Sequence, residues 1–120
     1  MLPDRHRLHT AADFRTVVRR GRRAARPLLT VHLLAGRPED LDAGPARAGL
    51  VVSKAVGGSV VRHRTSRRLR ALLLPLLGGL PAGTRLVVRA APGAGSAPSR
   101  ALAQDLDAAL STAVRPRSRR

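Results

Sequence analysis

Cysteine is absent from the 120-residue chain, which excludes disulfide bonds, thiolate metal sites and thiol nucleophiles. Aromatic residues are almost as scarce, because Phe14 is the only phenylalanine and there is no tyrosine or tryptophan. The longest apolar run, residues 71–80, is about half of the ~20 residues that a membrane-spanning helix needs, and Pro75 interrupts it. The first residues carry charges where a signal peptide would be apolar. We therefore expect a cytoplasmic protein with no membrane partner.

Acidic residues are few and unevenly placed. Seven Asp and Glu stand against 23 Lys and Arg, the formal net charge is +16, and no acid lies between Asp42 and Asp105. A surface selected for solubility alone would mix both signs. Apart from Lys54 every one of these cations is an arginine, whose planar guanidinium binds phosphate oxygens in pairs and stacks on bases. Such an excess predicts a nucleic-acid partner.

Hydrophobic periodicity predicts an alternation of helices and strands. Helices are expected at residues 11–20, at 59–74 and from Ser96 or Ser99 through Leu110, and strands at 26–34, 48–53 and 84–90. Residues 36–47, with their glycines, prolines and acids, are expected to form an exposed loop.

This order, α-β-β-α-β-α, predicts an α/β (α+β) fold, a two-layer sandwich. The second and third predicted strands flank the long helix, so we expect them to lie parallel in one sheet. The length favours a single RNA-binding domain over residues 1–114, followed by a basic C-terminal tail at 115–120.

The predicted long helix is half apolar and half cationic. At about 100° per residue its apolar residues share one side. The opposite arc and the two margins carry arginines, namely Arg62, Arg64, Arg67, Arg68 and Arg70. No acid is spaced to form an i,i+4 pair with them, so they repel one another unless a polyanion is present. We interpret them as an RNA-docking face rather than an ordinary solvated helix surface.

Residues 53–70 also resemble the signature of the bacterial ribonuclease P protein family, Arg-Asn-x-x-Lys-Arg-x-x-Arg after a Lys-x-x-Gly lead-in. The matching residues are Lys54 and Gly57 in the lead-in and Arg62, Arg67 and Arg70 in the pattern. His63 stands where the family has asparagine, and Ser66 stands where it usually has lysine. The RNA-binding residues that the resemblance and the helix pattern predict together are Lys54, Arg62, His63, Arg64, Arg67, Arg68 and Arg70.

The resemblance implies a ribosomal-protein-like fold with a left-handed β-α-β crossover, whereas general handedness rules predict a right-handed one. It implies the protein subunit of ribonuclease P, with ribonuclease P RNA and precursor tRNA as partners and no protein partner. In this family the subunit assists the endonucleolytic removal of the 5′ leader from precursor tRNA, and the arginine helix faces the RNA subunit.

The family further implies a cleft for the single-stranded leader, between the first helix and the open face of the sheet. Phe14 aligns with a cleft phenylalanine, while Val18 and His32 stand where relatives often carry Phe and Tyr. Single strands are usually held by aromatic stacking, and imidazole can both stack and form hydrogen bonds. The expected cleft residues are Phe14, Val18, Thr30, His32 and Arg89. A lone phenylalanine on a helix is also typical of a core, so that alternative stays open for Phe14.

No catalytic constellation is visible in the sequence. A protein nuclease needs carboxylates or histidines that hold two Mg²⁺ ions or act as acid and base. Asp105 and Asp107, two residues apart on a helix, point to different sides. We therefore predict no catalytic and no metal-ligating residue, with Mg²⁺ held mainly by the RNA subunit, which carries the chemistry. The alternatives are a ribosomal or other structural RNA-binding protein without a role in cleavage, and a nonspecific DNA-compacting protein.

Overall fold

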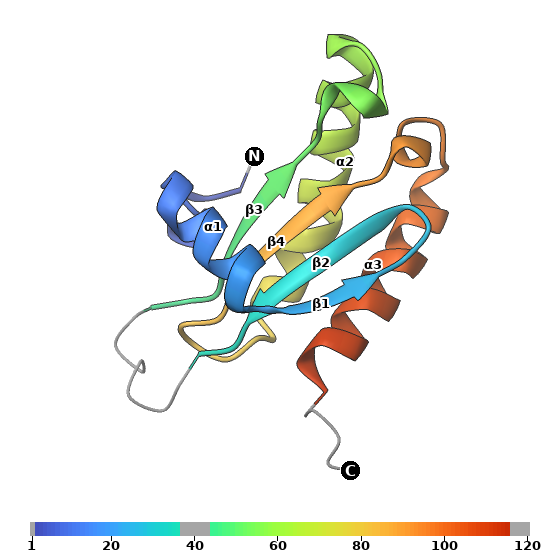
Figure 1. Ribbon diagram of the computed structural model, residues 1–120. Helices are drawn as coiled ribbons and strands as arrows, with labels where there is room; N and C mark the ends of the chain where they lie inside the picture. Colours follow the sequence, from blue (N-terminus) through green and yellow to red (C-terminus); the bar gives the residue numbers. More distant parts are fainter. Residues whose placement is uncertain (1, 37–43, 116–120) are drawn as a thin grey trace.

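The computed structural model describes residues 2–36 and 44–115, which form a four-stranded sheet with three helices (Figure 1). The elements in chain order are α1 (Ala11–Arg20), β1 (Arg22–Ala25), β2 (Leu29–Leu34), β3 (Arg47–Val51), α2 (Ser59–Leu77), β4 (Arg85–Ala90) and α3 (Ser99–Val114). Short 3₁₀ turns lie at Asp4–His6, Lys54–Val56 and Pro92–Gly95. None of the helices in the described ranges is long and apolar enough to cross a membrane.

The strand order in the sheet is β1-β2-β4-β3. Strand β2 runs antiparallel to both β1 and β4, and β3 runs parallel to β4, as predicted from the helix between them. In Figure 1, α2 and α3 lie behind the sheet and α1 lies in front of it. With β3 and β4 pointing upwards, β4 lies to the right of β3 and α2 lies behind both, so the crossover is left-handed. The α/β fold class is confirmed.

The main core lies between the sheet and the two rear helices. Strand residues Leu29, Val31 and Leu33 alternate toward it and are buried, as the period of two predicts. They meet the apolar sides of α2 and α3, including Leu69 and Leu106. A smaller cluster on the other side of the sheet holds α1 through buried Val17. We call the side of the sheet toward α1 the α1 face; it is the face that α2 and α3 leave uncovered.

Helix α1 begins and ends where the sequence predicts. The Thr10 hydroxyl accepts a hydrogen bond from the backbone N–H of Asp13 at 3.0 Å, which satisfies one of the free donors of the first turn. Gly21 caps the other end and donates its backbone N–H to Val17. The chain then turns directly into β1, so the position of α1 over the sheet is set by this short connection.

Strand β1 was not predicted, and the prediction that a strand starts at Arg26 is wrong. Residues 26–28 form the turn between β1 and β2, closed by a hydrogen bond from the Arg26 N–H to the Leu29 carbonyl at 2.8 Å. The Arg-Arg-Ala-Ala sequence of β1 has no β-branched or aromatic residue, so its strand conformation comes from pairing with β2 rather than from propensity.

Two helix boundaries also differ from the prediction. Helix α2 continues through Pro75 to Leu77, because Pro75 lies in the last turn and the burial of Leu77 holds that turn against the core. Helix α3 begins at Ser99 with Pro98 as its N-cap, so neither Ser96 nor Ser99 caps it. Of the loop predicted at 36–47, positions 37–43 lie outside the described residues, as do positions 116–120 of the predicted tail.

Candidate nucleic-acid interface

The arginines of α2 divide into three groups according to what borders them. Arg62 and Arg70 share a side with Ser66, spaced four residues apart, and Ser66 and Arg70 border β3. Arg67 and His63 lie on the outer side and are exposed. No salt bridge joins any α2 arginine to an acid within the part of the chain that the structure describes. Among the described residues the charge on this helix is therefore not paired with acids.

Arg64 and Arg68 form the third group, whose guanidiniums are hydrogen-bonded to the segment before α3. Arg64 donates to the carbonyl of Gly95 at 3.1 Å. Arg68 donates through Nε to the Ser99 hydroxyl at 3.0 Å and through Nη2 to the Ala97 carbonyl. These guanidiniums tie α2 to the segment that leads into α3. Arg64 is nevertheless exposed and also lines the outer hollow at the start of α2.

The outer group surrounds the start of α2. Ser59, Val60, His63, Arg64 and Arg67 line an open hollow of about 450 Å³. The first turn has Gly58 as N-cap, no side-chain cap and no acidic residue. Its free backbone N–H groups and the positive end of the helix dipole therefore add to the positive charge of Arg67. Lys54, on the preceding 3₁₀ turn, is exposed as well. This end of α2 presents donors and cations suited to phosphate oxygens.

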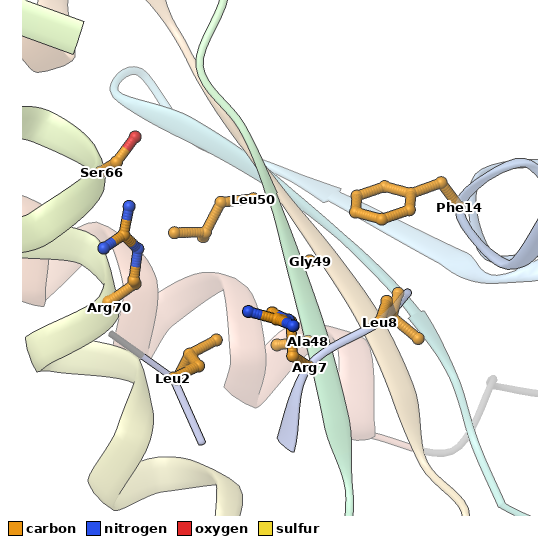
Figure 2. A pocket seen from close by; sticks show the side chains of 9 residues that line it. All are labelled: Leu2, Arg7, Leu8, Phe14, Ala48, Gly49, Leu50, Ser66 and Arg70. Carbon is orange, nitrogen blue, oxygen red and sulfur yellow. The ribbon is translucent and has the colours of Figure 1, made fainter. Parts of the chain in front are cut away.

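A second hollow, of about 270 Å³, joins the arginine helix to α1 around the outer edge of β3 (Figure 2). Ser66, Arg70 and Leu50 lie on one side of β3 in this view, and Phe14 lies on the other. Arg7 borders the same hollow beside Ala48, where the Leu8 N–H donates to the Ala48 carbonyl at 3.0 Å. One predicted RNA-binding residue, Arg70, and one predicted cleft residue, Phe14, thus line the same depression.

Phe14 is half-buried and packs with the cluster around Val17. A Cβ added to Gly49 would overlap the Phe14 ring, so the ring lies directly over this glycine of β3. Phe14 therefore contributes to a small core and also lines the hollow at the strand edge.

The other predicted cleft residues gather in a separate hollow on the α1 face. Val18, Thr30, His32 and Arg89 line a cavity of about 220 Å³, together with Arg23, which the sequence did not identify. His32 is only 6% exposed, and its Nδ1 is buried without a hydrogen-bond partner among the described residues. Burial, with the positive charges of Arg89 and Arg23, lowers the pKa of His32 below its ordinary value. The imidazole is therefore neutral at physiological pH.

The two hollows are connected by one row of residues across the sheet. The register places Arg23 beside His32, His32 beside Val87, and Val87 beside Gly49. Side chains of paired residues point to the same side, so this row lies on the α1 face from one edge strand to the other. Arg23 lies at the β1 end of the row, and Phe14 lies over Gly49 at the β3 end. Val87, in the middle of the row, is fully buried in the cluster with Val17 of α1, so the row links the two hollows through packed side chains and not along an open surface.

No group of three or more His, Asp or Glu side chains that could hold a metal ion occurs in residues 2–36 and 44–115. Asp105 and Asp107 point to different sides of α3, as predicted: Asp105 is buried against the β1–β2 turn and Asp107 is exposed.

The family model described as Ribonuclease P matches residues 2–114. The chain belongs to the ribonuclease P protein family. It is 57% identical over 114 residues to the ribonuclease P protein component of Streptomyces bikiniensis, covering 92% of this chain and 93% of the relative. It is also 51% identical over 117 residues to the component of a Mycobacterium species, covering 98% and 96%.

Solved structures of ribonuclease P proteins share the fold. The Staphylococcus aureus protein superposes with a TM-score of 0.77 at 23% identity, covering 91% of this chain and 95% of that one. The Thermotoga maritima protein, in complex with 1-(4-fluorophenyl)-2-thiourea, gives a TM-score of 0.71 at 20% identity, covering 92% and 100%.

Two site residues escaped the sequence reasoning. Arg23 was not assigned to a face because β1 has no strand-like pattern, so its register with His32 was invisible. Arg7 precedes the predicted elements, and its position at the edge of β3 follows from the parallel bridge to Ala48. The only signal for either residue was its positive charge in a chain with few acids.

Proposed function

We propose that this chain is the RNA-binding subunit of a ribonuclease P, and that it binds ribonuclease P RNA through α2 and the 5′ leader of precursor tRNA across the α1 face. The observation that carries the proposal is the depression at the edge of β3, because it joins Arg70 of α2 and Arg7 to Phe14 on α1. One bound RNA assembly could then contact both α2 and α1.

The protein's part in the reaction is positioning and charge screening. Arg62, Arg67 and Arg70 neutralise phosphates of the RNA subunit, and His63 supplies a hydrogen bond where the family has asparagine. The described residues offer no cluster of carboxylates for a divalent cation. This donor set fits Mg²⁺ held mainly by RNA phosphates, with the hydrolysis carried by the RNA subunit. The complex would act in the cytoplasm.

Reconstitution tests the proposal. The protein is mixed with ribonuclease P RNA and precursor tRNA at low Mg²⁺, and cleavage is compared with that by RNA alone. Faster cleavage, together with tighter binding of precursor than of mature tRNA, is expected. Cleavage no faster than that of RNA alone would overturn the assignment. Tight RNA binding without faster cleavage would favour a structural RNA-binding protein.

A further inference from the structure

The hollow on the α1 face offers a ligand almost only hydrogen-bond donors and positive charge. Arg23 and Arg89 are exposed, come from β1 and β4, and stand on either side of the strand that carries His32. The one other polar group in the lining is the Thr30 hydroxyl, and Val18 of α1 closes the upper side. No carboxylate lines the hollow. A group with several acceptor oxygens and a negative charge fits this lining better than a base does.

The hydrogen-bonding state of the His32 imidazole also favours a ligand with acceptor oxygens. Its Nδ1 is buried without a partner, so a proton on that nitrogen would be an unsatisfied buried donor. A proton on Nε2 avoids that unsatisfied donor, and an Nε2–H group can donate to an acceptor oxygen of a ligand. His32 then adds a third donor between two guanidiniums.

We propose that Arg23, Arg89 and His32 form a binding site for one phosphodiester group of the RNA leader, with Arg23 as a positioning residue for the leader. This inference rests on the proposed function and deepens it. In place of stacking on several aromatic residues, this chain holds the leader backbone at one linkage beyond Phe14. Such a contact positions the strand without reading its sequence.

The geometry also supplies a matched control. Arg22 precedes Arg23 on the same strand, but its partner in β2 is Leu33, which faces the main core side. Arg22→Met therefore removes the same charge from the same strand on the opposite side of the sheet. Arg23 is exposed, so Arg23→Met is expected to fold normally.

The test uses the reconstituted complex and precursor tRNAs in which one leader phosphate at a time is replaced by a neutral methylphosphonate. With the wild-type protein, one linkage is expected to lose affinity about tenfold when neutralised, the loss typical of a charge-assisted hydrogen bond. With Arg23→Met, affinity for the unmodified precursor should fall by a similar factor, and neutralising that linkage should then have little further effect. Arg23→Lys should recover part of the loss, and Arg22→Met should behave as wild type.

Three outcomes would overturn the inference: equal losses for Arg22→Met and Arg23→Met, equal losses for precursor and mature tRNA, or a linkage profile that Arg23→Met leaves unchanged. Inorganic phosphate is then added as a competitor. If the hollow is a site for free phosphate, millimolar phosphate would occupy it and the effect would not depend on whether the tRNA carries a leader. The proposed function fails separately, if the wild-type protein neither accelerates cleavage nor distinguishes precursor from mature tRNA.

Discussion

The ring of Phe14 lies directly over Gly49, so the contact between α1 and β3 depends on a residue without a side chain. Gly49→Ala should push the ring away and lower the free energy of unfolding by about 1–3 kcal/mol, the range for overpacking. Urea denaturation measures the change. Adding Phe14→Leu to Gly49→Ala should restore part of the stability, because the shorter side chain leaves room for the methyl group. An unchanged denaturation midpoint for Gly49→Ala would show that packing of the Phe14 ring does not require a glycine at position 49.

Phe14 itself is expected to contribute to leader binding as well as to packing, because it lines the hollow at the β3 edge. Phe14→Ala should weaken binding of precursor tRNA more than binding of mature tRNA, by about 1–3 kcal/mol if one base stacks on the ring. Binding of both RNAs to the reconstituted complex provides the comparison. Equal losses for the two would place Phe14 in the small core alone.

Arg67 and Arg68 are neighbours in sequence with different expected roles. Arg67 is exposed and unpaired within the described residues, whereas Arg68 donates hydrogen bonds to the Ala97 carbonyl and the Ser99 hydroxyl. Arg67→Ala should weaken RNA binding and reduce the slope of log affinity against log salt by roughly one unit. Arg68→Ala should mainly lower the free energy of unfolding, by about 1 kcal/mol, since its hydrogen bonds are only partly buried. Identical salt slopes in wild type and Arg67→Ala would show a merely solvated side chain.

Asp105 joins α3 to the β1–β2 turn and therefore to the strand that carries Arg23. Its Oδ2 accepts the backbone N–H of Leu28 at 2.9 Å, and its Oδ1 lies 3.5 Å from Arg26 Nε. Asp105→Ala leaves that N–H without its acceptor and should cost about 1–3 kcal/mol of stability. Asp105→Asn keeps an acceptor oxygen and should cost less, because the ion pair to half-exposed Arg26 contributes little. Thermal unfolding of the two variants shows which substitution costs more stability. A larger loss of stability for Asp105→Asn than for Asp105→Ala would contradict this account.

Stability should fall in mildly acidic solution because of His32. The folded state holds the pKa of His32 below the ordinary 6.5, so below about pH 6.5 the unfolded chain binds a proton that the folded one does not. The free energy of unfolding therefore decreases as pH drops from 6.5 toward the lowered pKa and is unaffected by His32 above that window. His32→Gln should remove this component, seen as a flatter profile than that of wild type between pH 7 and 5. Parallel profiles would mean that the imidazole is not buried as the structure shows.

Much of the fold could be predicted because local chemistry specifies it. The Thr10–Asp13 cap, the alternation of Leu29, Val31 and Leu33, and the periodicity of α3 each express a rule that acts over a few residues. The cationic character of α2 needed no structure either, since no acid lies near it in the sequence. Family resemblance, not periodicity, supplied the left-handed crossover, because the general rule favours the opposite hand.

The sequence by itself thus determined the elements, the charge and the kind of partner that this protein requires. Only the tertiary structure decided which cations are free: it engages Arg64 and Arg68 with the segment before α3, and it brings Arg23 beside His32 through a strand with no strand-like sequence. The physical reason is that propensity and charge are properties of single residues and short spacings. Strand register and side-chain hydrogen bonds join residues far apart in the chain, and these exist only once the sheet has formed.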